Sequence, residues 1–254
     1  MKKPALKRLF LDLETSPLTV YTWRIGYKIQ LSHENIIRER SIICAGYKWE
    51  HEKAAKSIEW DMSMNDRPIL EELLPIVNEA DEIVMHNGDR FDLPWIKTRC
   101  IFHGLPMYPD YKTIDTLAWA KRNFLFNSNR LDYISKFLGA EGKLKTEYAL
   151  WKRIYGQNDR NALAYMAKYC RRDVIELEKV YQKLAAYVNP KSHVGVMAKH
   201  DNWTCPHCGS EKVHANGTRV TAAGTVRHRM ICDKCKRYSS IDDAAFARYE
   251  KAKE

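Results

Sequence analysis

Short segments in which apolar and polar positions alternate dominate the first 60 residues. Residues 8–15 alternate with period two, and residues 41–49 and 56–60 are apolar and aromatic stretches of similar length. Such patterns are typical of β-strands. Because consecutive strands joined by short turns usually pair, these segments predict an antiparallel meander. Residues 18–40, which are rich in aromatic side chains, fit either a hairpin or an irregular excursion.

Apolar positions three and four residues apart become frequent after residue 64. The elements predicted there are a helix over 65–80, a short buried strand over 82–86 and helices over 93–103, 113–121, 131–138 and 161–188. The last helix is the longest, and Asn189-Pro190 ends it. Strands first, then a strand alternating with helices, and finally a long helix predict an α/β or α+β domain around one mixed sheet, and we take α/β as the fold class.

The composition favours a nucleic-acid partner. The chain has 254 residues, of which 45% are hydrophobic, and its net charge is +10. Positive charge of this size favours a polyanion, most often nucleic acid. No apolar run approaches the ~18 residues of a membrane span. The first apolar run stops at Leu11, before an acid, which excludes a signal peptide. We therefore expect a soluble, cytoplasmic protein without a membrane partner.

Two acids end the first predicted strand. Asp12 and Glu14 share one face of it, about 7 Å apart along the chain. Two carboxylates on one face of a buried strand repel each other and are costly to desolvate, and a cation between them removes both costs. The alternative is an edge strand whose polar face meets water.

Two later segments also offer acids among apolar residues. Residues 86–92 follow a buried strand and open a helix, at the strand end where α/β sheets place ligands. The alternative there is a capped turn, with Asp89 or Asp92 as the cap. In the long helix, Tyr169 and Asp173 share a face because they are four residues apart. The alternative is a partly exposed, solvated helix face.

Taken together, the three segments predict a metal site. Four carboxylates come from a strand, a strand-to-helix junction and a long helix: Asp12, Glu14, Asp92 and Asp173. Magnesium and manganese prefer oxygen ligands. Two such ions ~3.5–4 Å apart can activate an attacking water and stabilise the leaving oxygen of a phosphodiester.

The same three segments resemble the exonuclease motifs of the DEDD superfamily, which are D-x-E, N-x(2–3)-[FY]-D and Y-x(3)-D. They are Asp12–Glu14, Asn87–Asp92 and Tyr169–Asp173. The tyrosine form of the third motif marks the DEDDy branch, similar to the proofreading domain of B-family DNA polymerases. Residues 113–117 and 131–139 resemble the segments between the second and third motifs of that family. The resemblance covers residues 8–185.

This resemblance implies a ribonuclease H-like fold, a mixed β-sheet flanked by helices, and metal-dependent 3′→5′ exonucleolysis that releases nucleoside monophosphates. The metal ligands it implies, for two Mg²⁺ or Mn²⁺ ions, are Asp12, Glu14, Asp92 and Asp173, with Asp12 bridging both ions. It gives Tyr169 the role of orienting the attacking water.

The resemblance also implies substrate contacts. Asn87 and Phe91 are expected to line the terminal nucleotide, and Leu13 and Thr15 to lie near the terminal sugar. Two lysines that follow the Leu138-Gly139 turn, Lys143 and Lys145, are expected to reach the phosphate; the alternative is a solvated loop.

Four of the seven cysteines predict a second metal site. Cys205 and Cys208 form one C-x2-C pair, and Cys232 and Cys235 form another after 23 residues. Paired thiolates at this spacing suit one structural, tetrahedral Zn²⁺. We therefore predict a ribonuclease H-like domain over 1–188, joined to a zinc ribbon as follows. A linker spans 189–202, the ribbon 203–240, and a short helix or tail 241–254.

The predicted ribbon is basic and resembles zinc ribbons found beside transposase and other DNA-handling domains. Residues 202–240 hold seven Lys and Arg against two acids, and a hairpin is predicted around Gly224. Arg219, Arg227 and Arg229 on this hairpin are expected to bind the phosphate backbone. The alternative is a ribbon that docks a replication or recombination partner protein.

These observations favour a 3′→5′ exonuclease acting on nucleic acid, DNA rather than RNA and single-stranded in particular, in replication, repair or recombination. One alternative is a nucleic-acid-binding recruitment module on a nuclease-like scaffold. Others are an RNA-directed nuclease and a structure-specific nuclease, because the catalytic metals meet a phosphodiester in every case.

Overall fold

The chain divides into two compact units. The computed structural model describes residues 6–139 and 147–254. One unit is Lys7–Val188, and Asn189–Glu254 belong to the other. The segment predicted as a linker, 189–202, holds a short helix, α7 (Val194–Met197). The exact domain boundaries stay a prediction.

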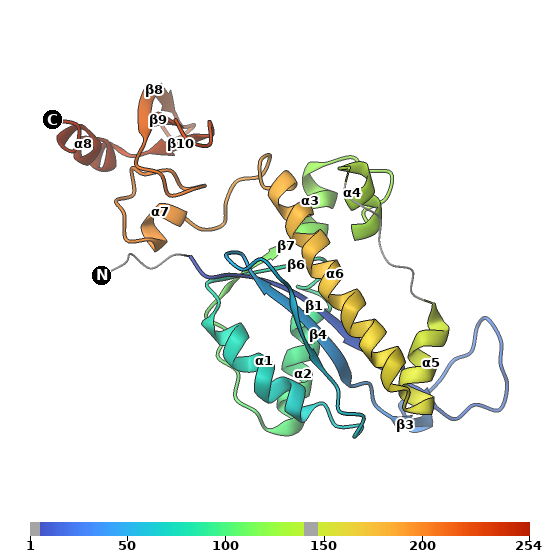
Figure 1. The fold of residues 1–254 in the computed structure, drawn as a ribbon. Coiled ribbons are helices and arrows are strands. Elements are labelled where there is room, and N and C mark those ends of the chain that lie inside the picture. Colours follow the sequence, from blue (N-terminus) through green and yellow to red (C-terminus); the bar gives the residue numbers. More distant parts are fainter. Residues whose placement is uncertain (1–5, 140–146) are drawn as a thin grey trace. The chain divides into compact units, whose positions relative to one another are not determined.

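The first unit is built on a five-stranded mixed sheet (Figure 1). In the order of the sheet, its strands are β5 (Lys56–Glu59), β4 (Ile42–Trp49), β1 (Arg8–Thr15), β6 (Glu82–Met85) and β7 (Lys112–Asp115). The strands β1, β4 and β5 pair antiparallel, as the predicted meander requires, and β6 and β7 extend the sheet in parallel. The acid-bearing strand β1 is therefore central.

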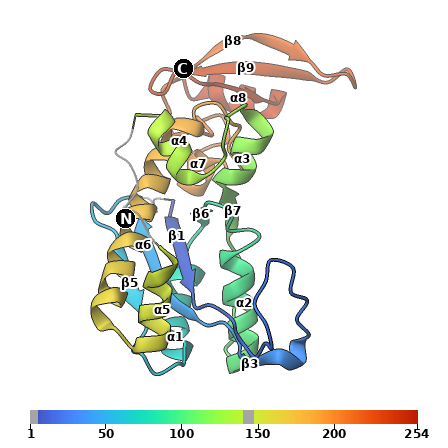
Figure 2. The ribbon, with the colours of Figure 1, turned by 90° about the vertical axis from the view of Figure 1, so that its right-hand side faces the viewer.

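Helices cover both faces of this sheet. They are α1 (Arg67–Glu79), α2 (Asp92–His103), α3 (Thr116–Asn123), α4 (Leu131–Phe137), α5 (Tyr148–Gln157) and α6 (Arg160–Leu184). The helices α1 and α2 lie on one face, and α6 crosses the other (Figures 1 and 2). This arrangement confirms the predicted mixed sheet flanked by helices.

The alternation in β1 decides which side chains meet α6. Leu9 and Leu11 are fully buried in the larger core cluster. Phe10 points the other way and packs edge-on against Tyr181 of α6, with 5.6 Å between the ring centroids. Asp12 and Glu14 share the face of Phe10, so both carboxylates are directed towards the layer that contains α6.

The predicted helix over 113–121 is partly wrong. Its first residues form β7, in which Ile114 pairs with Val84 of β6. The helix begins only at Thr116, where the Asp115 side chain accepts hydrogen bonds from the N–H groups of Leu117 and Ala118. A pairing between strands far apart in the sequence outweighed the local helical spacing. The helix α5 was not predicted.

Residues 18–40 combine the two alternatives, because two short paired strands are joined by a long irregular loop. These strands are β2 (Thr19–Val20) and β3 (Ile36–Arg38), which pair antiparallel. A single 3-10 turn, η1 (His33–Asn35), precedes β3. Between β2 and η1 a long loop projects from the body of the unit (Figures 1 and 2).

The second unit is a small sheet with one longer helix. Its elements after α7 are β8 (Val213–Val220), β9 (Val226–Cys232), β10 (Tyr238–Ile241) and α8 (Asp243–Lys251). The strands form an antiparallel sheet in the order β10-β9-β8, which includes the predicted hairpin. Two of the few buried residues in its core are cysteines. Among the residues described in either unit, no helix is long and apolar enough to cross a membrane.

A buried acid ties β4 to α1 and α2. Asp66, fully buried at the start of α1, accepts hydrogen bonds from the Ile42 N–H at 2.9 Å and from Arg99 Nε at 2.7 Å. His103 Nε2 lies 2.6 Å from its other oxygen. Burial raises the pKa of Asp66, but the hydrogen bonds from Arg99 and His103 outweigh that effect and hold the pKa below its usual value.

We predict that Asp66→Asn lowers the free energy of unfolding by ~3–5 kcal/mol at pH 7, because it leaves the Arg99 guanidinium buried without its charge partner. The lowered pKa means that Asp66 stabilises the fold above pH ~4 and that this contribution is lost as the pH falls further. Urea unfolding from pH 7 to pH 3 therefore should show the two proteins converging in acid. Asp110→Asn, the same substitution at an exposed site, is the control. A constant difference across this range would contradict the assignment.

Candidate functional site

A pocket of about 1010 Å³ opens where β1 ends. It is lined by six parts of the chain: β1, the segment after β6, α3, residues 129–136 at α4, Glu147 before α5, and α6. Its lining residues are Asp12, Glu14, His86, Asn87, Leu117, Lys121, Asn129, Arg130, Leu131, Asp132, Lys136, Glu147, Tyr169 and Asp173. The sequence motifs account for the acids from β1 and α6. The fold brings Asp12 and Asp173, which are 161 residues apart in the sequence, to one cavity.

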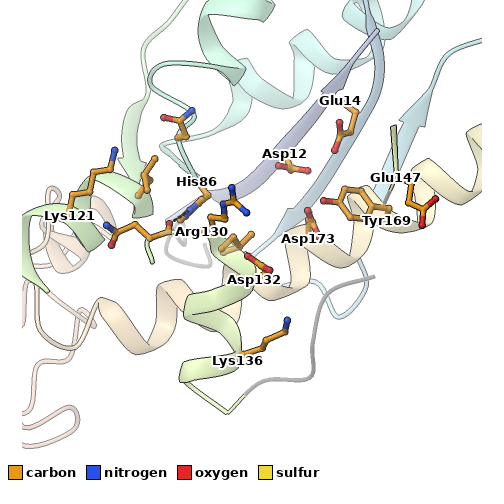
Figure 3. A pocket seen from close by; sticks show the side chains of 14 residues that line it. Asp12, Glu14, His86, Lys121, Arg130, Asp132, Lys136, Glu147, Tyr169 and Asp173 are labelled. Carbon is orange, nitrogen blue, oxygen red and sulfur yellow. Dashed lines mark hydrogen bonds between the residues drawn. The ribbon is translucent and has the colours of Figure 1, made fainter. Parts of the chain in front are cut away.

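The acidic side of the pocket is formed by β1 and α6. Figure 3 shows Asp12 and Glu14 on the strand directed towards Tyr169 and Asp173 on the helix. Tyr169 is 5% exposed and Asp173 is 4% exposed. The Sγ of Cys170 lies 3.6 Å from a carboxylate oxygen of Asp12, which fixes how closely the helix approaches the strand.

Gly46 permits this close approach. It is the cross-strand partner of Asp12 on β4. A Cβ atom at this position would lie 2.8 Å from the carbonyl oxygen of Cys170 on α6. That atom belongs to the helix backbone and cannot move aside as a side chain does. The absence of a side chain at Gly46 therefore allows α6 to pack directly on β4 beside Asp12.

Asp92 contacts the same strand, β1, from the start of α2. It is the first residue of α2 and is 3% exposed. Its Oδ1 accepts a hydrogen bond of 2.8 Å from the N–H of Leu13, the residue between Asp12 and Glu14. Burial raises the pKa of Asp92 to about 7, and the nearby carboxylate of Asp115 adds to this effect. A bound cation would offset the cost of ionising this buried group.

The donor types suit oxygen-preferring divalent cations, although among the described residues no three of these carboxylates have ligand atoms within 4.8 Å of one another. Carboxylates from β1 and α6 line one cavity, and the buried Asp92 is hydrogen-bonded between the two strand acids. Mg²⁺ and Mn²⁺ take such ligands together with water, which an open pocket supplies. The residues that could hold them are Asp12, Glu14, Asp92 and Asp173.

The opposite side of the pocket carries cations that the sequence analysis missed. Lys121 of α3, Arg130 just before α4 and Lys136 of α4 line the cavity, together with one acid, Asp132. Figure 3 shows Lys121 and Arg130 across the cavity from Glu14 and Tyr169. The segments around them resembled family sequences, but only the fold shows that their cations meet the acidic motifs.

His86 connects three of the segments that line this side of the pocket. Its Nδ1 lies 2.9 Å from Oγ1 of Thr116, and its Nε2 lies 2.9 Å from the carbonyl oxygen of Asn129. The imidazole thus links the end of β6 to α3 and to the segment that precedes α4. Asn87, which follows it, also lines the pocket, with a left-handed φ of 73° and an N–H that donates to Asp115.

Three other predicted substrate contacts, Leu13, Thr15 and Phe91, are not among the residues that line the pocket. Leu13 is 3% exposed and belongs to the hydrophobic core. Thr15 pairs with Ile42 at the end of β1. Phe91 packs edge-on against Trp95 at the start of α2, with ring centroids 6.4 Å apart. Lys143 and Lys145 lie outside the described residues. Their contacts with substrate stay a prediction.

The four cysteines of the second unit converge. Their Sγ atoms all lie within 4.8 Å of one another, and within residues 6–139 and 147–254 theirs is the one group of three or more metal-ligating side chains that meets this limit. The pairs Cys205–Cys235 and Cys208–Cys232 have Sγ atoms 3.6 Å apart. A zinc ion with four Zn–S bonds of ~2.3 Å needs sulfur atoms ~3.8 Å apart, so the set fits tetrahedral Zn²⁺.

The pKa of one of these thiols favours the thiolate form. Burial raises the pKa of Cys232, but the backbone N–H groups of Cys235 and Lys234 outweigh that effect and lower it to about 7. The N–H of Cys235 lies 3.5 Å from the Cys232 sulfur. A thiolate is the form that binds zinc.

The three predicted arginines share one face of the small sheet. Arg219 on β8 is the cross-strand partner of Arg227 on β9, and Arg229 follows two residues later, on the same face. Arg227 donates to the carbonyl of Ser240, and Arg229 lies over the Tyr238 ring at 4.9 Å. Like charges directly opposite each other are unfavourable unless an anion lies between them.

Comparisons with known proteins place this site in a family context. The family model of the RNase H superfamily matches residues 9–185. Among solved structures, the chain is similar to the family B DNA polymerase from the hyperthermophilic archaeon Pyrobaculum calidifontis, with a TM-score of 0.55 and 15% identity. The similarity covers 77% of this chain and 26% of the polymerase, so the chain spans about a quarter of that enzyme and shares its fold there. No curated protein matches the sequence significantly.

We predict that Gly46→Ala destabilises the first unit by ~1–3 kcal/mol, because the added methyl group forces α6 away from β4. Urea unfolding would measure the change. Gly156→Ala is the matched control, since nothing lies within 4 Å of a Cβ atom at that exposed position in α5. A helical Gly→Ala substitution without a clash stabilises by ~1 kcal/mol. Equal effects of the two variants would contradict the close-packing argument.

We also predict one zinc ion per chain, measured by mass spectrometry of the metal content after purification under reducing conditions. Cys205→Ala and Cys235→Ala should each lose it, because three thiolates leave the site open. Cys100→Ala, at a buried cysteine of the first unit, should keep a full equivalent. Retention of zinc by the two ligand variants would show that the metal is held elsewhere.

Proposed function

Because the chain belongs to the RNase H superfamily, we propose that it is a metal-dependent 3′→5′ exonuclease of the DEDDy type that acts on single-stranded DNA. The superfamily and the polymerase-like fold support a nuclease scaffold. The observation that carries the proposal is the pocket in which Asp12 and Glu14 of β1 meet Tyr169 and Asp173 of α6. The 3′→5′ polarity comes from the resemblance of the three motifs.

The four acids would hold the catalytic cations. Asp12, Glu14 and Asp173 face the cavity, and Asp92 is anchored to the strand between the first two by its hydrogen bond to Leu13. When bound, two Mg²⁺ or Mn²⁺ ions supply Lewis-acid stabilisation of an attacking water and of the leaving oxygen. The protein supplies rigid placement, because the ligands come from a central strand and two packed helices.

Tyr169 would orient the attacking water. Its hydroxyl lies on the pocket side of α6, one turn from Asp173 (Figure 3). A phenol hydroxyl can donate one hydrogen bond and accept another, which suits the placement of water beside a scissile phosphate. Its ring is buried, so the hydroxyl has a fixed position.

The cations opposite the acids would bind the nucleic-acid backbone. Lys121, Arg130 and Lys136 line the same cavity as the acids. A phosphodiester strand that enters the pocket would place its reacting phosphate on the acidic side and neighbouring phosphates on the basic side. In the second unit, the shared face of Arg219, Arg227 and Arg229 would add backbone contacts without reading sequence.

We predict that the zinc-loaded protein releases mononucleotides from a 3′-end-labelled single strand in the presence of Mg²⁺ or Mn²⁺. Asp12→Asn and Asp92→Asn should each lower the rate at least 100-fold, because each removes a charged ligand. Asp89→Asn is the matched control, since Asp89 lies in the same segment as Asp92 but is exposed. Product analysis on sequencing gels would measure all four proteins.

Two further assays test the direction of degradation and the class of substrate. A 3′-terminal phosphorothioate should block the 3′→5′ reaction, whereas a 5′-terminal one should not. Side-by-side rates on single-stranded DNA, duplex DNA and RNA would rank the substrates, with single-stranded DNA fastest. Internal cuts, or full activity in both Asp12→Asn and Asp92→Asn, would refute the assignment. Tight binding without any cleavage would favour the recruitment-module alternative.

A further inference from the structure

The loop between β2 and η1, residues 21–32, exposes an unusual number of aromatic side chains; we call it the aromatic loop. Trp23 is 103% exposed and Tyr27 is 100% exposed, as much as in an extended chain, and Tyr21 is 74% exposed. Ile25, which lies between Trp23 and Tyr27 in the sequence, is 94% exposed. Large apolar side chains rarely stay in water without a role, and such a group marks an interaction site.

The base of the aromatic loop is firmly anchored. The N–H of Tyr21 donates to the carbonyl of Asn35 at 2.9 Å, and the Asn35 side chain donates back to the Tyr21 carbonyl at 3.2 Å. A capping box between Ser32 and Asn35 fixes the returning strand. The guanidinium of Arg38 stacks over the ring of Tyr155 in α5, 5.5 Å from its centroid. The exposed aromatics are therefore presented on a built hairpin.

The charge of the aromatic loop indicates its partner. Its charged side chains are Arg24 and Lys28, and it contains no acid. Aromatic rings interleaved with cations are the pattern with which proteins bind single-stranded nucleic acid, because rings stack on unpaired bases and cations contact phosphates. A duplex offers no free base faces to such rings. An acidic protein partner would use the cations but would not need three exposed rings.

The aromatic loop follows the acid-bearing strand closely in the sequence, separated from it by residues 16–20, which include β2. Trp23 follows Glu14 by nine residues, so the chain can separate them by at most ~30 Å. The loop is therefore close along the chain to the acids of the candidate catalytic pocket. Both belong to the unit Lys7–Val188.

We propose that Trp23 and Tyr27 form a stacking platform for unpaired bases of a single-stranded nucleic acid, with Arg24 and Lys28 contacting its phosphates. The inference rests on the proposed function in so far as the bound strand is the one that enters the nuclease pocket. The platform reads no sequence, since every base has a face to stack on. It adds a single-strand preference that the pocket cations alone do not supply.

The experiment measures binding of a fluorescently labelled, mixed-sequence 20-nucleotide DNA by anisotropy, using the full zinc-loaded chain without added Mg²⁺ or Mn²⁺. The double variant Trp23→Ala/Tyr27→Ala should weaken single-strand binding at least tenfold, since stacking on one base is worth ~1–3 kcal/mol. Binding to a blunt duplex of the same length should change less than twofold. Trp23→Phe/Tyr27→Phe should restore most of the affinity.

Salt dependence separates the two kinds of contact. The alanine variant should keep the wild-type slope of log affinity against log salt, because it removes no cation. Arg24→Ala/Lys28→Ala should reduce the magnitude of the slope by ~1.4, about 0.7 per phosphate contact on a single strand. Tyr108→Ala is the control. Tyr108 is an aromatic residue that is 70% exposed and precedes the N-terminal end of β7, so its substitution should leave affinity and slope unchanged.

Unchanged single-strand affinity in Trp23→Ala/Tyr27→Ala would overturn the proposal, as would an equal loss on duplex DNA. The readout is binding without cleavage, so its outcome is independent of the nuclease assay. If the alanine variant loses single-strand affinity but the wild-type protein cleaves nothing, the platform stands and the proposed function fails. Circular dichroism and thermal unfolding would check that the exposed substitutions leave the fold intact.

Discussion

The direct packing of one helix backbone against the central sheet is the constraint on which the site depends. At Gly46 the carbonyl of Cys170 approaches so closely that a methyl group would not fit. The Cys170 thiol then lies against Asp12. One residue before and three residues after this contact, α6 carries Tyr169 and Asp173. If α6 lay farther from β4 by the width of a methyl group, it would carry the same side chains but would not bring them to β1.

This packing gathers like charges, and the molecule shows how such a cluster can be tolerated. The buried Asp92 has a pKa raised to about 7, so the site favours extra positive charge. The pocket provides open space for cations beside the acids and has a basic far side formed by Lys121, Arg130 and Lys136. Asp66 differs from Asp92, because its hydrogen bond from Arg99 compensates for burial and lowers its pKa. Asp66 thus has a charge partner within the fold, whereas Asp92 has a hydrogen bond from the Leu13 N–H and a raised pKa.

Local patterns in the sequence predicted much of this arrangement. The alternation of Phe10, Asp12 and Glu14 gave the face of β1, and the spacing of Tyr169 and Asp173 gave the face of α6. The two C-x2-C pairs gave the cysteine cluster, because ligands close in sequence need only one turn each to converge. The mixed sheet followed from the order of strands and helices.

Features that depend on long-range contacts could not be predicted. Residues 113–115, predicted as the start of a helix, belong to β7 because β6 offered a partner. Lys121, Arg130 and Lys136 carry no motif, and only the packing of α3 and α4 brings them to the acids. The aromatic side chains of residues 21–32 were visible in the sequence, but their full exposure on an anchored hairpin was not. A sequence pattern does not distinguish an aromatic that packs in the core from one that is presented to a ligand.

We expect the acids of β1, α2 and α6 to hold a pair of divalent cations, and Mn²⁺ titration followed by electron paramagnetic resonance is the sharpest test of this arrangement. The zinc-loaded protein should bind two Mn²⁺ ions per chain, with the spin–spin broadening expected of ions ~3.5–4 Å apart. Asp12→Asn and Asp173→Asn should lose the pair, and Asp89→Asn should keep it. Absence of bound Mn²⁺ in the wild-type protein, or retention of the pair in both ligand variants, would contradict the account.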